Sequence, residues 1–131
     1  MYKGERQRQF PTTLSTTQFV KLYILHLLTE KNYYGNRIKD EISRRLNGKW
    51  SPSYGMIYPL LRELEEQGYI EGWWDEPNKR SIRRYKITDI GIEHYKVIKI
   101  QNKESLDDSL LIIKNILKDI YKVKDKFLGG V

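Results

Sequence analysis

Apolar residues recur at helical spacing in the first third of the chain. Ser15-Thr16-Thr17-Gln18 has the spacing of a capping box and predicts a helix that runs to about Thr29. The helix has two apolar faces, one formed by Phe19, Leu22, Tyr23 and His26 and the other by Val20, Ile24 and Leu27. Two apolar faces indicate that this helix contacts more than its own domain.

A second helix is predicted from Arg37 to Leu46. Its apolar residues Ile38, Ile42 and Leu46 recur every four positions, and Asn47-Gly48 ends the run. The charged positions between them are typical of a solvated surface.

The segment from Trp50 to Leu64 predicts a short capped helix. Ser51 or Ser53 can cap its first turn, and Pro52 suits a helix start. The apolar residues Ile57, Leu60, Leu61 and Leu64 fall on one face, which leaves Gly55, Tyr58, Pro59 and Arg62 facing outward. The outward face is small, aromatic and cationic, as expected of a helix that enters a DNA groove.

A β-hairpin is predicted directly after this helix. Gly68 stops the helical run, Tyr69–Trp74 reads as a strand, residues 75–81 hold turn residues, and Ile82–Ile87 reads as the return strand. A helix followed by a two-stranded ribbon with a basic tip, called the wing below, is the winged helix-turn-helix arrangement. The expected fold class is therefore mainly α with a small β-hairpin wing (α+β).

Several motifs in this region resemble the PadR-type bacterial transcriptional regulators. They are Tyr34-Gly35, Trp50-Ser51-Pro52-Ser53, Ile57-Tyr58-Pro59, Gly68-Tyr69-Ile70 and Tyr85-Lys86-Ile87-Thr88, in order and at compatible spacing across most of residues 15–100. The wing departs from the family pattern, because Pro77-Asn78-Lys79-Arg80 stands where a glycine is usual. Some family members stack flat aromatic ligands on a tryptophan of the C-terminal helix. The three tryptophans here all lie between residues 50 and 74, so the resemblance does not extend to drug sensing.

The chain after Thr88 is predicted to be helical to about Phe127, with a break at Asn102–Ser105 left open. An apolar stripe with alternating steps of four and three consists of Leu106, Leu110, Ile113, Leu117 and Ile120. Periodicity alone leaves open whether the stripe packs within the chain or between two chains. The resemblance favours a homodimer, because PadR-type regulators commonly dimerise through C-terminal helices that pack against the partner's N-terminal helix.

The composition narrows the class of protein. The 131 residues suit one domain, and a hydrophobic content of 39% with no long apolar run excludes an integral membrane protein. There is no cysteine and no apolar export segment at the start, so the expected compartment is the cytoplasm. His26 and His94 lie far apart and no phosphate-binding glycine loop is present, so we expect no enzyme, no catalytic residue, no metal site and no cofactor.

The net charge of +7 suggests a polyanionic partner. The cations are concentrated in an N-terminal arm (residues 1–14) with Lys3, Arg6 and Arg8, and in the wing, where no acid interrupts residues 79–86. A charge run of this kind can be a solvated surface, but its position after the Trp50–Leu64 helix favours phosphate contacts.

These patterns predict a homodimeric, sequence-specific regulator of transcription that binds double-stranded DNA, most simply as a repressor. Residues 15–100 form the DNA-binding domain and residues 101–131 the dimerisation helix. The expected base-reading residues are Ser53, Tyr54, Gly55, Tyr58 and Arg62, and the expected phosphate contacts are Lys79, Arg80, Arg83 and Arg84. A small aromatic effector between the subunits, lined by Phe19, Tyr23 and His26, is a further hypothesis, with a fully packed interface as its alternative. Two other functions stay open, a replication-terminator-like roadblock on DNA and a winged-helix module for protein interaction.

Overall fold

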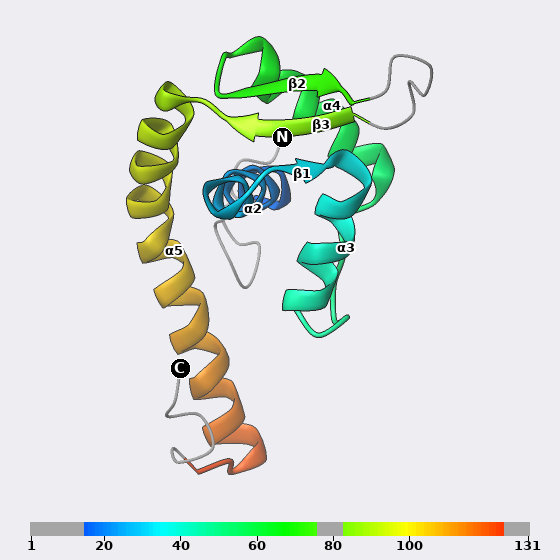
Figure 1. The fold of residues 1–131 in the computed structure, drawn as a ribbon. Coiled ribbons are helices and arrows are strands. Elements are labelled where there is room, and N and C mark those ends of the chain that lie inside the picture. The colour runs from blue at the N-terminus through cyan, green and yellow to red at the C-terminus, as the bar shows by residue number, and fades with distance from the viewer. Residues whose placement is uncertain (1–14, 76–82, 125–131) are drawn as a thin grey trace, which may run out of the picture. The chain divides into compact units, whose positions relative to one another are not determined.

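The computed structural model describes residues 15–75 and 83–124, which form helices and a small antiparallel sheet (Figure 1). The elements in chain order are α2 (Thr16–Glu30), β1 (Tyr33–Tyr34), α3 (Gly35–Arg45), α4 (Tyr54–Glu66), β2 (Ile70–Trp74), β3 (Arg83–Ile87) and α5 (Asp89–Tyr121). The chain divides into a compact unit of residues 16–99 and a second unit that includes residues 100–124. The mainly helical α+β class expected from the sequence is confirmed.

The core of the first unit is aliphatic and comes from α2, α3 and α4. α2 buries Val20, Ile24, Leu25, Leu27 and Leu28, α3 buries Ile38 and Ile42, and α4 buries Ile57, Leu60, Leu61 and Leu64. The second apolar face of α2 remains half-buried. Both faces predicted for this helix are therefore present: the face of Val20, Ile24 and Leu27 is fully buried, and the other packs partly against the same core.

α4 begins one residue after Ser53, whose Oγ accepts a hydrogen bond from the Met56 backbone N–H at 3.2 Å. Of the two serines that the sequence offered as caps, Ser53 is the one that caps the helix. Pro52 is buried ahead of the cap rather than placed in the first turn. Pro59 lies inside α4, where it has no N–H to donate to the carbonyl of Gly55. α4 ends before Gly68, which has a φ of +81°.

β3 is the central strand of the sheet, with β2 on one side and β1 on the other. The β2–β3 pairing confirms the predicted hairpin, and its register sets Gly72 opposite Tyr85 and Trp74 opposite Arg83. The strand β1 was not predicted. It pairs Tyr33 with Tyr85 and so joins the start of α3 to the hairpin.

Thr88 joins α5 to the hairpin and to the end of α4. Its hydroxyl donates to the Gly68 carbonyl at 2.6 Å and accepts from the Gly91 N–H at 3.1 Å, and so caps the start of α5. Its own N–H donates to the Tyr69 carbonyl at 3.0 Å. The first turn of α5 comes so close to the residue before β2 that a Cβ on Gly91 would overlap the Tyr69 carbonyl oxygen.

α5 is continuous from Asp89 to Tyr121, so the break considered at Asn102–Ser105 does not occur. In this part of α5 an i,i+4 ion pair joins Lys103 to Asp107 at 2.7 Å, and the Ser109 hydroxyl donates a hydrogen bond to the Ser105 carbonyl at 2.8 Å. None of the helices in the described part of the chain has the length and apolar character needed to cross a membrane.

A chain of polar contacts joins α5, α2 and α3. His26 Nδ1 lies 2.6 Å from the Tyr95 hydroxyl, and its Nε2 lies 3.4 Å from Glu30. Glu30 forms a two-point contact with Arg45 at 2.5 and 3.0 Å, and Arg45 Nε reaches Glu41 at 2.7 Å. Because each carboxylate serves more than one partner, the contacts form a network rather than separate pairs.

Glu41 is the half-buried acid of this network, and we expect its replacement to reduce stability at neutral pH. Hydrogen bonds from Arg44 and Arg45 lower the pKa of Glu41 from its usual 4.5 to about 2. A depressed folded-state pKa stabilises the fold above the unfolded value and ceases to do so as the pH falls toward 2. Glu41→Gln should therefore lower the free energy of unfolding by about 1 to 2 kcal/mol at neutral pH, with a smaller difference in acid.

Urea unfolding of both forms between neutral pH and pH 2 measures this difference, using the pKa of about 2 as the lower limit. Glu93→Gln is the matched control, because Glu93 is an exposed partner of Lys96 at 3.3 Å. Equal stability losses for the two variants would show that the network contributes nothing.

Candidate nucleic-acid interface

The outward face of α4 presents the five residues that the sequence proposed for base reading. They are all exposed: Ser53, Tyr54, Gly55, Tyr58 and Arg62. The rings of Tyr54 and Tyr58 are stacked, with centroids 5.9 Å apart and planes 17° from parallel. A Cβ on Gly55 would meet only the Ser53 Oγ, at 3.7 Å, so a partner can approach the backbone closely there. The face is a shallow aromatic ridge one turn long with an open start.

α3 contributes to the same surface, which the sequence reading missed. The Lys39 ammonium lies 5.0 Å from the centroid of the Tyr54 ring. A Cβ on Gly35 would lie 3.2 Å from the Tyr58 ring, so the start of α3 is packed directly against the middle of α4. Burial raises the pKa of Tyr58, which keeps this phenol neutral. The charged positions of α3 were read as solvated surface because helical periodicity does not show which neighbouring helix they face.

Arg83 is held inside the base of the wing. Its Nη2 donates to Glu65 at 2.6 Å and to the Gly72 carbonyl at 3.0 Å, and its guanidinium lies over the rings of Trp74 and Tyr85. This side chain therefore connects the hairpin to α4, and its charge is already matched by a carboxylate.

Arg84 belongs to a second cluster at the base of the wing. Its guanidinium lies 4.3 Å from the centroid of the Tyr34 ring, and its Nε lies 3.4 Å from Asp75. Asp75 accepts hydrogen bonds from the Tyr34 hydroxyl and from Trp73 Nε1, and the bond from Tyr34 is the main cause of its lowered pKa. The cluster ties β1 to both strands of the hairpin.

The remaining wing cations, Lys79 and Arg80, lie outside the described residues, as does the N-terminal arm. The four predicted phosphate contacts thus divide into two arginines with internal partners and two residues of the wing turn. Their contacts with DNA stay predictions.

The predicted dimer stripe lies on the second half of α5. Leu106, Ile113 and Ile120 are exposed, with Ile113 at 45% and Ile120 at 63%, while Leu110 and Leu117 are half-buried. An apolar stripe exposed to this degree is typical of an interaction surface.

Phe19, Tyr23 and His26 form a row of rings on the half-buried face of α2. Phe19 and Tyr23 meet edge to face at 5.7 Å, Tyr23 and His26 at 5.9 Å, and Trp50 extends the row beyond Phe19 at 5.7 Å. His26 is also hydrogen-bonded to Tyr95. Among the described residues no group of His, Cys, Asp and Glu side chains could hold a metal ion.

Comparison with known proteins gives the same fold. The model of the transcriptional regulator PadR-like family matches residues 24–97. An uncharacterized protein of Lysinibacillus sphaericus is 33% identical over 69 residues, which cover 52% of this chain and 63% of that protein.

Two solved structures support this fold. A transcriptional regulator from Clostridium thermocellum is 29% identical with a TM-score of 0.58, covering 78% of this chain and 90% of its own. PadR of Bacillus subtilis, solved in complex with operator DNA, is 28% identical with a TM-score of 0.53, covering 60% of this chain and 46% of its own. The family match spans the second half of α2, all of α3 and α4, the hairpin and the first turns of α5, and the chain therefore belongs to the transcriptional regulator PadR-like family.

Proposed function

We propose that this protein is a homodimeric transcriptional repressor that inserts the exposed face of α4 into the major groove of its operator. The family it belongs to consists of transcriptional regulators rather than enzymes. The observation that carries the proposal is the outward face of α4. It combines a capped start, a glycine with free space beside it, two stacked tyrosines and the exposed side chain of Arg62. The Bacillus subtilis relative was solved on operator DNA, which supports the same partner here.

We assign the recognition of bases to the first two turns of α4. Ser53, Tyr54 and Tyr58 carry hydroxyl groups, which can donate to and accept from base edges in the major groove. Arg62 lies more than two turns into the helix, where its side chain can contact either a base edge or a backbone phosphate.

The wing supplies affinity rather than sequence preference. Lys79 and Arg80 are placed by sequence at its turn, whereas Arg83 and Arg84 are engaged at its base. We assign phosphate contacts to the first two, and to Arg83 and Arg84 the additional task of holding the hairpin against α4 and β1.

Dimerisation places two α4 helices on one duplex. The exposed stripe of α5 and the half-buried aromatic row of α2 are the two apolar surfaces that the proposal pairs between subunits. A small aromatic effector would bind at Phe19, Tyr23 and His26 if that interface left a cavity, and binding there would alter the spacing of the two α4 helices.

We expect a binding assay to distinguish residues that recognise bases from residues that contact phosphates. Tyr54→Ala should weaken binding to an operator selected from a random duplex library by about 1 to 3 kcal/mol and leave binding to a scrambled duplex nearly unchanged. Lys79→Ala with Arg80→Ala should weaken both duplexes alike and lower the log-log salt slope by about two units, one for each lost phosphate contact.

The measurement is a titration of both duplexes at several salt concentrations. Arg83→Ala is left out of the wing variant because it would also remove the contact with Glu65. The assignment is reversed if the wing variant loses sequence preference while Tyr54→Ala keeps it. Absent or salt-insensitive DNA binding by the wild type would instead favour a protein-interaction module.

A further inference from the structure

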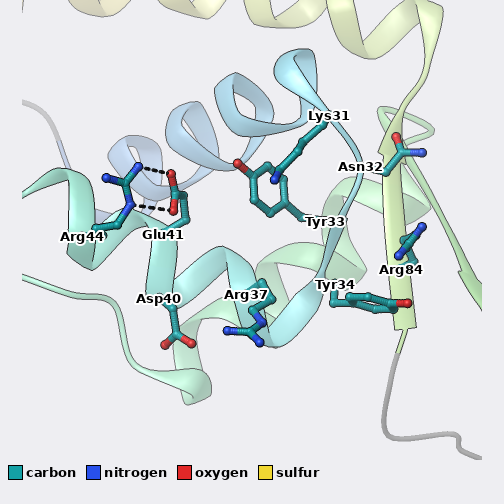
Figure 2. A pocket seen from close by; sticks show the side chains of 9 residues that line it. All are labelled: Lys31, Asn32, Tyr33, Tyr34, Arg37, Asp40, Glu41, Arg44 and Arg84. Carbon is teal, nitrogen blue, oxygen red and sulfur yellow. Dashed lines mark hydrogen bonds and ion pairs between the residues drawn. The ribbon is translucent and has the colours of Figure 1, made fainter.

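A cleft of about 450 Å³ lies beside the start of α3, away from the ridge of α4. Its walls come from the end of α2, from β1, from α3 and from Arg84 of β3 (Figure 2). The charged residues that line it are the cations Lys31, Arg37, Arg44 and Arg84 and the acids Asp40 and Glu41.

The positive charge of the cleft is only partly matched. Arg44 is paired with Glu41 at 2.6 Å, and Figure 2 shows the two side chains facing each other at one end. Lys31 and Arg37 are exposed and form no ion pair with any residue in the described part of the chain. Once the Arg44–Glu41 pair and the Arg84–Asp75 pair are set aside, two cations, Lys31 and Arg37, face one carboxylate, Asp40.

Arg84 lines the cleft but is already engaged. Its Nε lies 3.4 Å from Asp75, and its guanidinium lies over the Tyr34 ring. The cleft cations without a carboxylate partner among the described residues are therefore Lys31 and Arg37.

The backbone at the start of α3 has the same polarity. Tyr34 precedes the helix without a side-chain cap, and the first turn of this 11-residue helix contains no acid. Its free N–H groups and the helix dipole both favour an anion. This helix start is a supporting feature of the cleft, whose cations Lys31 and Arg37, unpaired within the described ranges, favour the same ligand.

The cleft is linked through α3 and β3 to the elements that the proposed function places on DNA. Gly35, which lies in sequence between the lining residues Tyr34 and Arg37, is packed against Tyr58 of α4, and Lys39, one turn further along α3, lies over Tyr54. Arg84 belongs to the strand that leaves the wing. A backbone strand that leaves the groove at Tyr58 would therefore pass this cleft before it reached the wing.

We propose that the cleft binds a backbone phosphate of the operator, held by Lys31 and Arg37. The proposal rests on the proposed function and adds to it a phosphate site outside α4 and the wing turn. This site fixes the position of the duplex along α3 and carries no base preference.

The test removes two of the cations and leaves the hairpin intact. In Lys31→Ala with Arg37→Ala we expect the log-log salt slope for the full-length protein to fall by about two units, with operator preference unchanged. Arg84 is kept, because it packs on Tyr34. Lys96→Ala with Lys99→Ala is the matched control, since it removes the same charge from exposed positions of α5 and should leave the slope unchanged. Gln substitutions at positions 31 and 37 serve if the alanine pair does not fold.

Duplexes with a single neutral methylphosphonate give the second measurement. One position should weaken wild-type binding and have no effect on the Lys31/Arg37 variant, which would locate the bound phosphate. A slope equal to that of the wild type, with the same methylphosphonate sensitivity, overturns the proposal.

Inorganic phosphate titrated into the DNA-free protein distinguishes the other source of the same chemistry. Saturable binding that is lost in the Lys31/Arg37 variant, together with an unchanged DNA slope, would reassign the cleft to a small anion and overturn the assignment to DNA. If the wild type binds no duplex at all, the proposed function fails as well. If the wild type binds its operator and the Lys31/Arg37 variant binds it with the same salt slope, only the cleft proposal fails.

Discussion

Gly91→Ala is expected to destabilise the first unit by about 3 kcal/mol or more, enough to leave much of the protein unfolded at physiological temperature. The added methyl group would overlap the Tyr69 carbonyl oxygen, which already accepts a hydrogen bond from the Thr88 N–H. Backbone cannot rotate away as a side chain can, so α5 would have to separate from the start of β2. Thermal and urea unfolding followed by circular dichroism measure the loss.

Gly55→Ala is the matched control for this prediction. Gly55 is also near the start of a helix, but an added Cβ there meets only the Ser53 Oγ at 3.7 Å. Alanine at an open helical position should leave stability equal or raise it slightly. A Gly91→Ala protein as stable as Gly55→Ala would mean that the contact with Tyr69 is readily relaxed.

The second large effect is expected for Ile113→Asp, which should abolish the dimer. Ile113 lies in the middle of the exposed stripe of α5, and a carboxylate buried there between two chains would have no partner. Light scattering should report a monomer, or a dimer only at much higher protein concentration. The first unit has its own aliphatic core, so its thermal transition should remain visible in the monomer.

Leu111→Asp separates this effect from a general loss of helix stability. Leu111 is 55% exposed and lies on the opposite side of α5 from the stripe. We expect that variant to stay dimeric. An intact dimer for Ile113→Asp at the same concentration would exclude the stripe as the interface.

The sequence was sufficient for the elements whose evidence is local. The two-faced helix α2, the capped helix α4 and the hairpin were all predicted, because apolar spacing, capping residues and turn residues act over a few positions. The break considered at Asn102–Ser105 does not occur, since the two weak helix formers Asn102 and Ser105 do not interrupt a long helix that has side-chain pairs at these positions.

The contacts that the sequence could not supply are distant ones. β1 has two residues and exists through its pairing with β3, about fifty positions later. Arg83 looked like a free cation of the wing until its partner Glu65 was known. The contact of Lys39 with Tyr54, and the cleft lined by Lys31 and Arg37, arise only when α2, α3 and α4 are packed side by side. Local pattern predicts the scaffold of this surface, and tertiary contacts decide which of its charges are available.

Pro59 has a consequence for how the operator is read. Because proline cannot donate to the Gly55 carbonyl, that main-chain oxygen loses its regular helical donor on the exposed side of α4. In the major groove, cytosine N4 and adenine N6 are donors that such an oxygen can accept from. Recognition through the main chain is invisible to alanine scanning, so a base pair could be strongly preferred at a position where no side-chain replacement relaxes the preference. The residue that permits it would be identified by restoring an N–H at position 59, and not by shortening any neighbour.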